Sequence, residues 1–323
     1  MNWNNKTVLL TGGTGSFGKK FTEVLLKTKN PKVLRVFSRD ELKQWEMQKM
    51  FAGEKRLRFF IGDIRDRARL HRAMENVDIV VHAAALKQVP ACEYNPFEAV
   101  LTNIIGAQNI INTALDHNVE KVLAISTDKA VNPVNLYGAT KMCMEKLFVA
   151  GNHYVGKTHV TKMSCCRYGN VVGSRGSVIP VFKKQRETGT VTLTDPRMTR
   201  FWLTLDQGVD FVIRSIETMH GGEVFVPKIP SMKMTELAKA IAPDCKVKIT
   251  GIRPGEKLHE CLLTEDESRH AIDLGKNFVI LPENPMWGFK EYSNGKKLPD
   301  GYRYASDNNT CWLKTSELLE MAK

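Results

Sequence analysis

Residues 11–18 read TGGTGSFG and follow a short apolar run, KTVLL, at residues 6–10. The glycines fit two overlapping spacings, G-x-G-x-x-G and G-x-x-G-x-x-G, through Gly12, Gly13, Gly15 and Gly18. Between a strand and a helix, such glycines allow a tight turn and the close approach of a pyrophosphate, and the helix start offers free N–H groups to the anion. The stretch therefore predicts a dinucleotide-binding site, with a plain glycine-rich turn as the alternative.

The first half of the chain alternates short apolar runs with longer mixed segments. The apolar runs predict strands at residues 6–10, 33–37, 57–61, 77–84 and 121–126. The mixed segments predict helices at residues 17–28, 41–51, 67–75 and 97–117, and one more from about 135 to 150 before a strand at 159–169. This alternation is typical of the α/β class. We expect a Rossmann fold, which is a doubly wound parallel sheet with helices on both faces.

After about residue 170 this pattern breaks into short pieces with Gly and Pro in the loops, apart from a helix expected at 204–219 and a short last helix from Thr315 or Ser316. We therefore expect a cofactor-binding Rossmann domain and a smaller, interleaved substrate-binding lobe. The first comprises residues 1–170 and about 204–222, and the second comprises about 171–203 and 223–323.

The composition is that of a soluble globular protein, with 42% hydrophobic and 25% charged residues in a chain of 323. No apolar run approaches the roughly 20 residues of a membrane helix, and the first residues, MNWNNKTVLL, lack the apolar core of a signal peptide. We therefore expect a cytoplasmic protein with no membrane partner. The seven cysteines form no C-x-x-C pair, which favours buried free thiols over a zinc site, so no metal is expected.

The net charge of +12 is spread along the chain, and no nucleic-acid-reading motif occurs. A ligand that carries phosphates accounts for a locally basic site as well as a nucleic acid does. We therefore expect a small anionic ligand and no nucleic-acid partner.

The residues at the end of the second predicted strand help to distinguish an NAD site from an NADP site. A carboxylate there would favour NAD through the ribose hydroxyls, but the sequence reads FSRDELK. Ser38 and Arg39, with Lys43 one helical turn later, suit a 2′-phosphate, so NADP is favoured over NAD. Asp40 and Glu41 weaken this interpretation unless they cap the next helix.

Three further polar residues follow or lie in predicted strands. Asp63 follows the third strand and is placed to reach the adenine, whereas Asp66 is expected to cap the next helix. His82 lies in an apolar strand and is predicted to be a hydrogen-bonded core histidine.

Residues 125–141, ISTDKAVNPVNLYGATK, hold four reactive side chains, Asp128, Lys129, Tyr137 and Lys141. Tyr137 and Lys141 are four residues apart and share one helical face. A lysine cation and an oxidised nicotinamide would lower the tyrosine pKa from its usual value of about 10. Such a base can take a proton from an alcohol while hydride leaves its carbon. The neighbours Asp128 and Lys129 are either a second acid and base or an ordinary surface ion pair.

The chain resembles the extended short-chain dehydrogenase/reductases and, among them, the inverting UDP-N-acetylglucosamine 4,6-dehydratases of pseudaminic acid biosynthesis. The similarity runs from residue 6 to about 312 and rests on the ordered motifs TGGTGSFGK, FSRDELKQ, IGDIRD, HAAALKQVP, STDKAVNPVNLYGATK, RYGNVVGSRGSV, RMTRFW, GGEVFVPKIPSMK, IRPGEKLHE and SDNN. Related dehydratases of the same sugar nucleotide replace the active-site tyrosine with methionine. Tyr137 therefore points to the pseudaminic acid branch.

The resemblance implies a reaction in which tightly bound NADP is recycled. Tyr137 would deprotonate the sugar 4-hydroxyl while C4 gives up hydride, and Thr127 would hydrogen-bond the 4-oxygen. The ketone then makes the C5 hydrogen acidic, so that Lys129 can remove it while Asp128 protonates the departing 6-hydroxyl. Lys129, in place of the glutamate of retaining relatives, goes with inversion at C5. We expect burial and Lys141 to lower the pKa of Lys129, and desolvation to favour protonated Asp128.

The resemblance also implies sets of contact residues. The predicted cofactor contacts are Gly12, Thr14, Gly15, Ser16, Phe17, Gly18, Ser38, Arg39, Lys43, Asp63, Ile64, Ala83, Ala84, Lys87, Tyr137 and Lys141. The predicted contacts of UDP-N-acetylglucosamine are Lys87, Asn170, Ser177, Val178, Arg200, Arg253 and Glu256, and residues 172–178 would wrap the nucleotide. Asn170 and the two arginines would hold the diphosphate, because the planar guanidinium matches phosphate oxygens in pairs. Glu256 would take the uridine ribose.

Two other functions are compatible with this fold. A nucleotide-sugar 4-epimerase uses the same tyrosine and lysine but never acts on C5 or C6. A non-catalytic regulator that senses NADP(H) needs no base, so the retained Tyr137, Lys141 and Asp128–Lys129 pair argue against it. The resemblance further implies a homo-oligomer, a dimer or larger, and a product used in surface or flagellin glycosylation.

Overall fold

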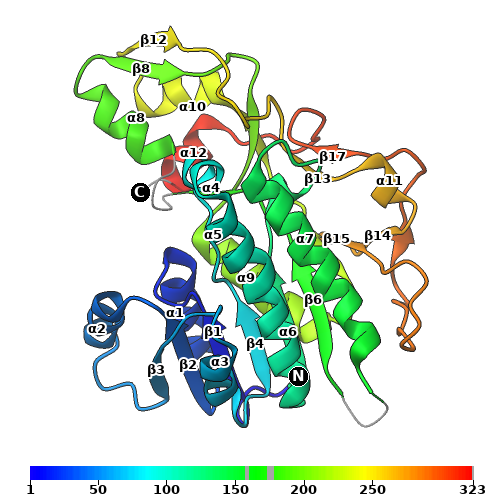
Figure 1. The fold of residues 1–323 in the computed structure, drawn as a ribbon. Helices are drawn as coiled ribbons and strands as arrows, with labels where there is room; N and C mark the ends of the chain where they lie inside the picture. The colour runs from blue at the N-terminus through cyan, green and yellow to red at the C-terminus, as the bar shows by residue number, and fades with distance from the viewer. Residues whose placement is uncertain (157–159, 173–177, 322–323) are drawn as a thin grey trace.

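The computed structural model describes residues 1–156, 160–172 and 178–321, and a ten-stranded sheet forms the centre of this part of the chain (Figure 1). Its strand order is β16-β14-β15-β10-β6-β5-β4-β1-β2-β3. The strands from β10 to β3 run parallel, and β15, β14 and β16 add antiparallel pairs at one edge. The parallel strands are β1 (Thr7–Thr11), β2 (Val33–Ser38), β3 (Leu57–Ile61), β4 (Ile79–His82), β5 (Lys121–Ile125), β6 (Lys162–Cys166) and β10 (Val224–Pro227). The edge strands are β14 (Ala271–Asp273), β15 (Asn277–Ile280) and β16 (Lys296–Lys297).

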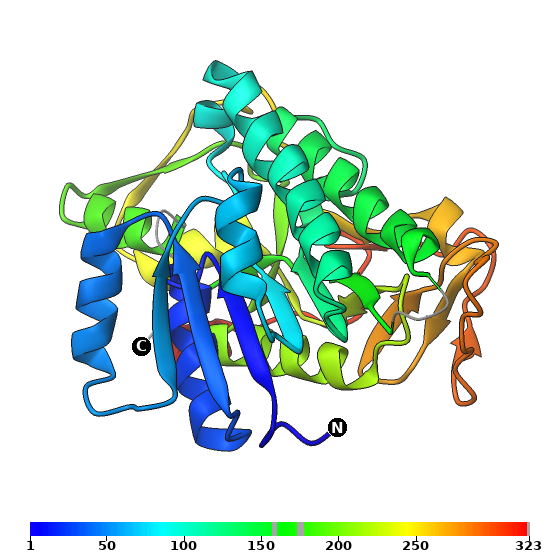
Figure 2. The ribbon, with the colours of Figure 1, turned by 60° about the horizontal axis from the view of Figure 1, so that its bottom comes forward.

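Helices cover both faces of this sheet, as Figure 2 shows. One apolar core lies beneath α1 (Ser16–Thr28), α2 (Glu41–Met50) and α9 (Leu205–Thr218). The other lies beneath α3 (Arg67–Met74), α6 (Gly106–Asp116) and α7 (Leu136–Gly151). The strand order reverses between β1 and β4, and in doubly wound sheets ligands bind at the carboxyl ends of the strands beside such a switch point. The predicted α/β Rossmann class is therefore confirmed.

A second group of elements lies beyond the carboxyl ends of the parallel strands (Figure 1). Its small sheets are β7 (Asn170–Val171) with β9 (Thr199–Leu203) and β11 (Ser231–Lys233), β8 (Thr190–Leu193) with β12 (Lys246–Ile249), and β13 (Cys261–Leu263) with β17 (Tyr304–Ala305). Its helices are α8 (Val178–Arg186), α10 (Met234–Ile241) and α12 (Thr315–Met321), whereas α11 (Glu265–Ser268) lies beside β14 at the edge of the central sheet (Figure 1). A separate apolar cluster packs α8, α10 and α12 together.

The structure differs from the sequence-based expectation in three places. The central sheet continues into residues 223–323 through β10, β15, β14 and β16, so this range does not belong to the second lobe alone. The strand expected at 159–169 is the shorter β6. The helix expected at 97–117 is α5 (Pro96–Val100), a π-helical turn (Leu101–Ile105) and α6, preceded by a separate α4 (Val89–Tyr94).

Buried Asn103 lies in the π-helical turn and connects the loop after β4 with helix α7. Its side-chain amide accepts a hydrogen bond from the Leu86 N–H at 2.8 Å and donates to the Leu86 carbonyl at 2.9 Å and Thr140 Oγ1 at 3.0 Å. These bonds fix the loop after β4 against the helix that carries Tyr137.

Other local expectations are confirmed in part. Asp40 and Asp66 accept hydrogen bonds at the starts of α2 and α3, as caps do. All seven cysteines are free, although only four are buried and Cys311 is exposed. Among the described residues, no helix is both long and apolar enough to cross a membrane.

His82 is a core histidine, as predicted, but only one of its ring nitrogens has a partner. Nδ1 lies 2.9 Å from Thr11 Oγ1, whereas Nε2 has no hydrogen-bond partner among the described residues. Burial, with a smaller effect from the Lys141 cation, lowers the pKa of His82 to about 3. The ring therefore stays neutral in the folded protein.

We predict that His82 makes folding stability depend on pH. The unfolded chain takes up a proton at His82 below a pKa of about 6.5, and the folded chain does not until about 3. The stability from this neutral ring is thus complete above pH ~6.5 and is lost as the pH falls. Between pH ~7 and ~5, wild type should lose about 2 kcal/mol more unfolding free energy than His82→Asn. Urea denaturation at both pH values measures this difference, and equal losses in the two proteins would contradict it.

Candidate active site

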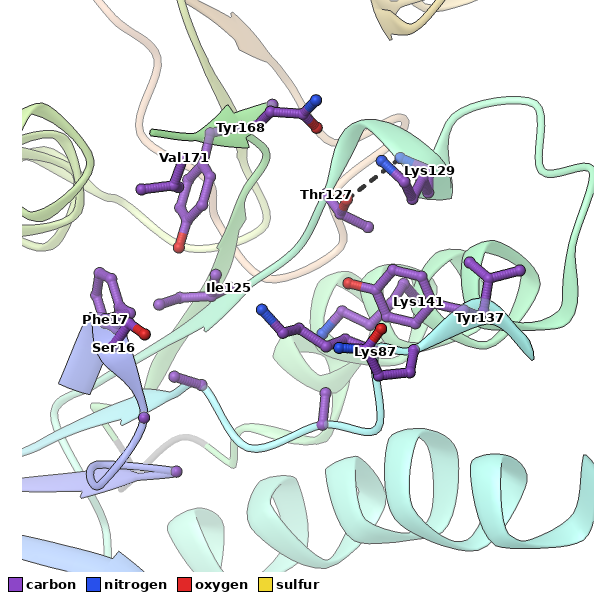
Figure 3. A pocket seen from close by; sticks show the side chains of 18 of the residues that line it. Ser16, Phe17, Lys87, Ile125, Thr127, Lys129, Tyr137, Lys141, Tyr168 and Val171 are labelled. Atoms are coloured by element: carbon purple, nitrogen blue, oxygen red, sulfur yellow. Dashed lines mark hydrogen bonds between the residues drawn. The ribbon is translucent and has the colours of Figure 1, made fainter. Parts of the chain in front are cut away.

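A cavity of about 990 Å³ lies across the carboxyl ends of the parallel strands, between the Rossmann sheet and the second group of elements. Its lining includes the glycine loop after β1, the loops after β4 and β5, the start of α7 and the segment 253–257. Figure 3 shows Tyr137, Lys141 and Lys87 directed into this space, with Thr127 and Lys129 beside them.

The glycine loop fits a dinucleotide because its backbone is held close to its neighbours. Gly12 has φ +67°, and a Cβ there would lie 2.8 Å from the Ala84 backbone N. A Cβ on Gly18 would lie 2.2 Å from the Gly13 carbonyl oxygen. All of the residues predicted to contact the cofactor line the cavity, from the glycine loop to Lys141. Their roles as contacts remain predictions.

After β2, both cations predicted to bind a 2′-phosphate have carboxylate partners. Arg39 Nη1 lies 3.5 Å from Asp63 Oδ2, and Lys43 forms an ion pair with Asp40. Burial alone would raise the pKa of Asp63, but Arg65 and Arg39 outweigh it and hold this pKa below its usual value. Arg39 is about half exposed, so its guanidinium is accessible from the cavity.

Tyr137 and Lys141 lie on α7, whose first turn is capped by the Asn135 side chain. Both are buried, at 8% and 3% exposed. Burial raises the pKa of Tyr137 to about 12, and the groups that oppose this rise are Lys129 and Thr127. Lys141 is not among the groups that lower this pKa, and the lowering expected from Lys141 together with an oxidised nicotinamide remains a prediction. Burial lowers the pKa of Lys141 itself to about 8.

Asp128 and Lys129 form a partly buried ion pair rather than a surface one, since Lys129 is 28% exposed. Lys129 Nζ lies 3.0 Å from Asp128 Oδ1, which also accepts a hydrogen bond from Thr127 Oγ1 at 2.9 Å. Asp128 is 1% exposed and does not line the cavity, whereas Lys129 does. Burial and the nearby Glu260 raise the pKa of Asp128, as expected for an acid.

Glu260 is the site residue that the sequence reasoning missed. Its side chain is 3% exposed, and its Oε1 lies 3.3 Å from Lys129 Nζ and 3.9 Å from Arg200 Nε. Burial lowers the pKa of Lys129, but Asp128 and Glu260 outweigh burial, so the net pKa is raised. The expected lowering is therefore wrong, because a second carboxylate faces the amine. Nothing in the motif IRPGEKLHE indicates that its last residue lies beside Lys129.

The predicted substrate residues lie around the other half of the cavity. Asn170, Val178, Arg253 and Glu256 line it, as does Lys87. Ser177 and most of the segment 172–178 lie outside the described residues.

Arg200 also lines the cavity, but much of its guanidinium is occupied by backbone. Nη1 donates to the carbonyls of Thr199 and Leu258, and Nη2 donates to the carbonyl of Lys257. Arg200 therefore holds the segment 257–258 in place, and its contact with a diphosphate remains a prediction.

A glycine loop at the switch point of a Rossmann sheet, a Tyr-x-x-x-Lys helix and a second lobe over one cavity define a short-chain dehydrogenase/reductase. The chain belongs to the family described as polysaccharide biosynthesis protein, whose profile matches residues 8–282.

Three known proteins are similar to this chain over nearly its whole length. It is 51% identical to UDP-N-acetylglucosamine 4,6-dehydratase (inverting) from Campylobacter jejuni, over 99% of this chain and 98% of the relative. It is 41% identical to UDP-glucose 4-epimerase from Rickettsia bellii, over 98% of this chain and 95% of the relative. The X-ray structure of Pen from Bacillus thuringiensis superposes with a TM-score of 0.91 at 41% identity, over 99% of this chain and 98% of that one.

We predict that Gly12→Ala weakens dinucleotide binding at least about tenfold, which is ~1.4 kcal/mol. The added Cβ would collide with the Ala83–Ala84 backbone and displace the loop. Gly53→Ala is the matched control, since Gly53 also has positive φ (+85°) but its Cβ would meet no atom within 4 Å. Titration with NADP, followed by fluorescence, measures both. Equal affinities of Gly12→Ala and Gly53→Ala would contradict the prediction.

Proposed function

We propose that the protein is a UDP-N-acetylglucosamine 4,6-dehydratase that inverts C5 and gives UDP-2-acetamido-2,6-dideoxy-β-L-arabino-hex-4-ulose. The 51% identity to a relative of that name supports the assignment. The observation that carries it is the Asp128–Lys129 pair beside the cavity that Tyr137 lines. A 4-epimerase needs the tyrosine but has no use for a second acid and base.

In the first step, the Tyr137 phenolate takes the proton of the sugar 4-hydroxyl, and Thr127 hydrogen-bonds the 4-oxygen. Protonated Lys141 favours the phenolate through its positive charge on the same helix. The glycine loop would hold NADP, which when bound would supply the remaining chemistry of the reaction, the acceptance of hydride from C4 and its return to C6. Neighbouring backbone atoms leave no space for a Cβ at Gly12 or Gly18 in this glycine loop.

In the second step, the Lys129 amine takes the C5 proton, which the neighbouring ketone has made acidic, and the Asp128 carboxyl protonates the 6-hydroxyl, which leaves as water. The resting ion pair reaches its reactive form when one proton moves across the 3.0 Å contact between Lys129 Nζ and Asp128 Oδ1. Asp128 Oδ1 then carries that proton, and Oδ2 has no hydrogen-bond partner among the described residues. Return of a proton to the opposite face of C5 inverts this centre.

Several finer points belong to the same proposal and rest on the sequence resemblance. They are the NADP preference, UDP contacts from Asn170, Arg200, Arg253 and Glu256, a role in pseudaminic acid biosynthesis and flagellin glycosylation, a cytoplasmic location and a homo-oligomeric state. The second lobe is proposed to bind the nucleotide sugar.

The product made in heavy water tests the proposed function. With UDP-N-acetylglucosamine as substrate, we expect a product lighter by one water in mass spectrometry and solvent deuterium at C5 in NMR. Replacement of Lys129 by alanine should slow turnover by about 10²–10⁴, which is the usual contribution of a general base. A C4 epimer without solvent deuterium would instead identify an epimerase, and intact turnover in Lys129→Ala would remove Lys129 from the mechanism.

Arg39 tests the cofactor preference. We predict that Arg39→Ala lowers NADP affinity by about tenfold or more, because a charged hydrogen bond contributes ~1.5–3 kcal/mol, and leaves NAD affinity unchanged. Arg65→Ala is the matched control, because Arg65 also pairs with Asp63 but does not line the cavity. Isothermal titration calorimetry measures the affinities. An equal loss for NAD and NADP in Arg39→Ala would contradict the preference.

A further inference from the structure

Glu260 takes no part in the reaction steps above, yet it is the second carboxylate at Lys129. Its Oε1 lies 3.3 Å from Lys129 Nζ, and its Oε2 has no hydrogen-bond partner among the described residues. A charged group at 3% exposure is costly unless other charges compensate it. Three cations do so here, since Arg200 and Lys257 lie 3.9 and 3.8 Å away in addition to Lys129.

The segment that ends at Glu260 is tied to the loop that carries Asp128 and Lys129. Lys257 Nζ donates a hydrogen bond to the Val131 carbonyl. Asn135 Nδ2 donates to the Gly255 carbonyl at 2.8 Å. Because these bonds flank the Glu260–Lys129 contact, the carboxylate and the amine keep a fixed separation.

The charges in this cluster are divided unequally. Burial would raise the pKa of Glu260, but Lys129, Arg200 and Lys257 outweigh it and hold this pKa below its usual value. The pKa of Asp128 is shifted in the opposite direction, upward, by burial and by Glu260. A proton that enters the cluster therefore goes to Asp128, and Glu260 keeps its negative charge.

We propose that Glu260 is the positioning residue of the C5 deprotonation step, where it holds the Lys129 amine toward the cavity and stabilises the ammonium that forms there. The C5 proton bonds to Lys129 Nζ, and the proton of Asp128 leaves with the 6-hydroxyl as water. The pair thus changes from amine and carboxylic acid to ammonium and carboxylate. Glu260, which is not consumed, lies 3.3 Å from the new positive charge. This inference rests on the proposed dehydratase function.

The test separates the two chemical steps by the near-ultraviolet absorbance of the reduced nicotinamide. Oxidation of the sugar at C4 produces the reduced nicotinamide, and this step requires Tyr137. The return of hydride to C6 consumes the reduced nicotinamide, and this step requires prior loss of the C5 proton. When the NADP-loaded enzyme is mixed with UDP-N-acetylglucosamine, Glu260→Gln should keep the rate of reduction within about twofold and slow reoxidation by about 10- to 100-fold, less than loss of the base itself. The reduced nicotinamide should accumulate, and solvent deuterium should enter C5 more slowly by the same factor.

Two further variants separate positioning from folding. Glu267→Gln removes another largely buried carboxylate, which pairs with Arg167 at 2.7 Å and does not line the cavity. It should lower stability and leave both rates unchanged. Glu260→Asp keeps the charge but withdraws it by one methylene, so it should show a smaller defect confined to reoxidation, and it is the deciding variant if Glu260→Gln does not fold.

The outcomes are distinct. A defect in Glu260→Gln or Glu260→Asp that falls equally on reduction and reoxidation, or on neither, would overturn the role of Glu260. A wild-type enzyme that reduces its cofactor with this substrate but neither releases water nor takes up deuterium at C5 would instead overturn the proposed function.

Discussion

The electrostatic pairing of a partly buried lysine with two buried carboxylates is the constraint on which the site depends. Lys129 lies between Asp128 and Glu260, at 3.0 and 3.3 Å, and the two carboxylates are 1% and 3% exposed. Removing one member of a buried ion pair costs about 3–5 kcal/mol. The three charged side chains therefore hold one another in position, and they also hold together the two chain segments to which they belong. One segment follows β5 of the Rossmann sheet and the other precedes β13, so the pairing also joins the two halves of the cavity.

The fold places the predicted cofactor site and the predicted acid and base residues at one cavity. The strand order reverses between β1 and β4, and the glycine loop lies at that point. Helix α7 brings Tyr137 and Lys141 to the same cavity. Relatives named for different activities, a dehydratase and an epimerase, align with nearly the whole of this chain. We therefore propose that the fold supplies the oxidation site and that the other residues around the cavity determine which reaction the oxidised sugar then undergoes.

Much of this could be predicted from the sequence because the signals are local. The glycine loop, the strand–helix alternation and the Tyr137–Lys141 spacing each lie within one short stretch, and each predicted its element or its place in the cavity. Glu260 could not be found this way, because its contact with Lys129 joins segments far apart in the chain. For the same reason the sequence analysis predicted a lowered pKa for Lys129, whereas Asp128 and Glu260 raise it. Asn103 in the π-helical turn, and the extension of the sheet by β10 and β14–β16, likewise depend on tertiary packing that no local pattern encodes.

The proposed reaction transfers hydride from C4 of the sugar to the cofactor and, after loss of water, from the cofactor to C6 of the same sugar. UDP-N-acetylglucosamine labelled with deuterium at C4 tests it most directly, with NMR and mass spectrometry of the product. The account predicts that the label moves to the new methyl group at C6. Label that is found at C4 of the product, or lost to solvent, would contradict it.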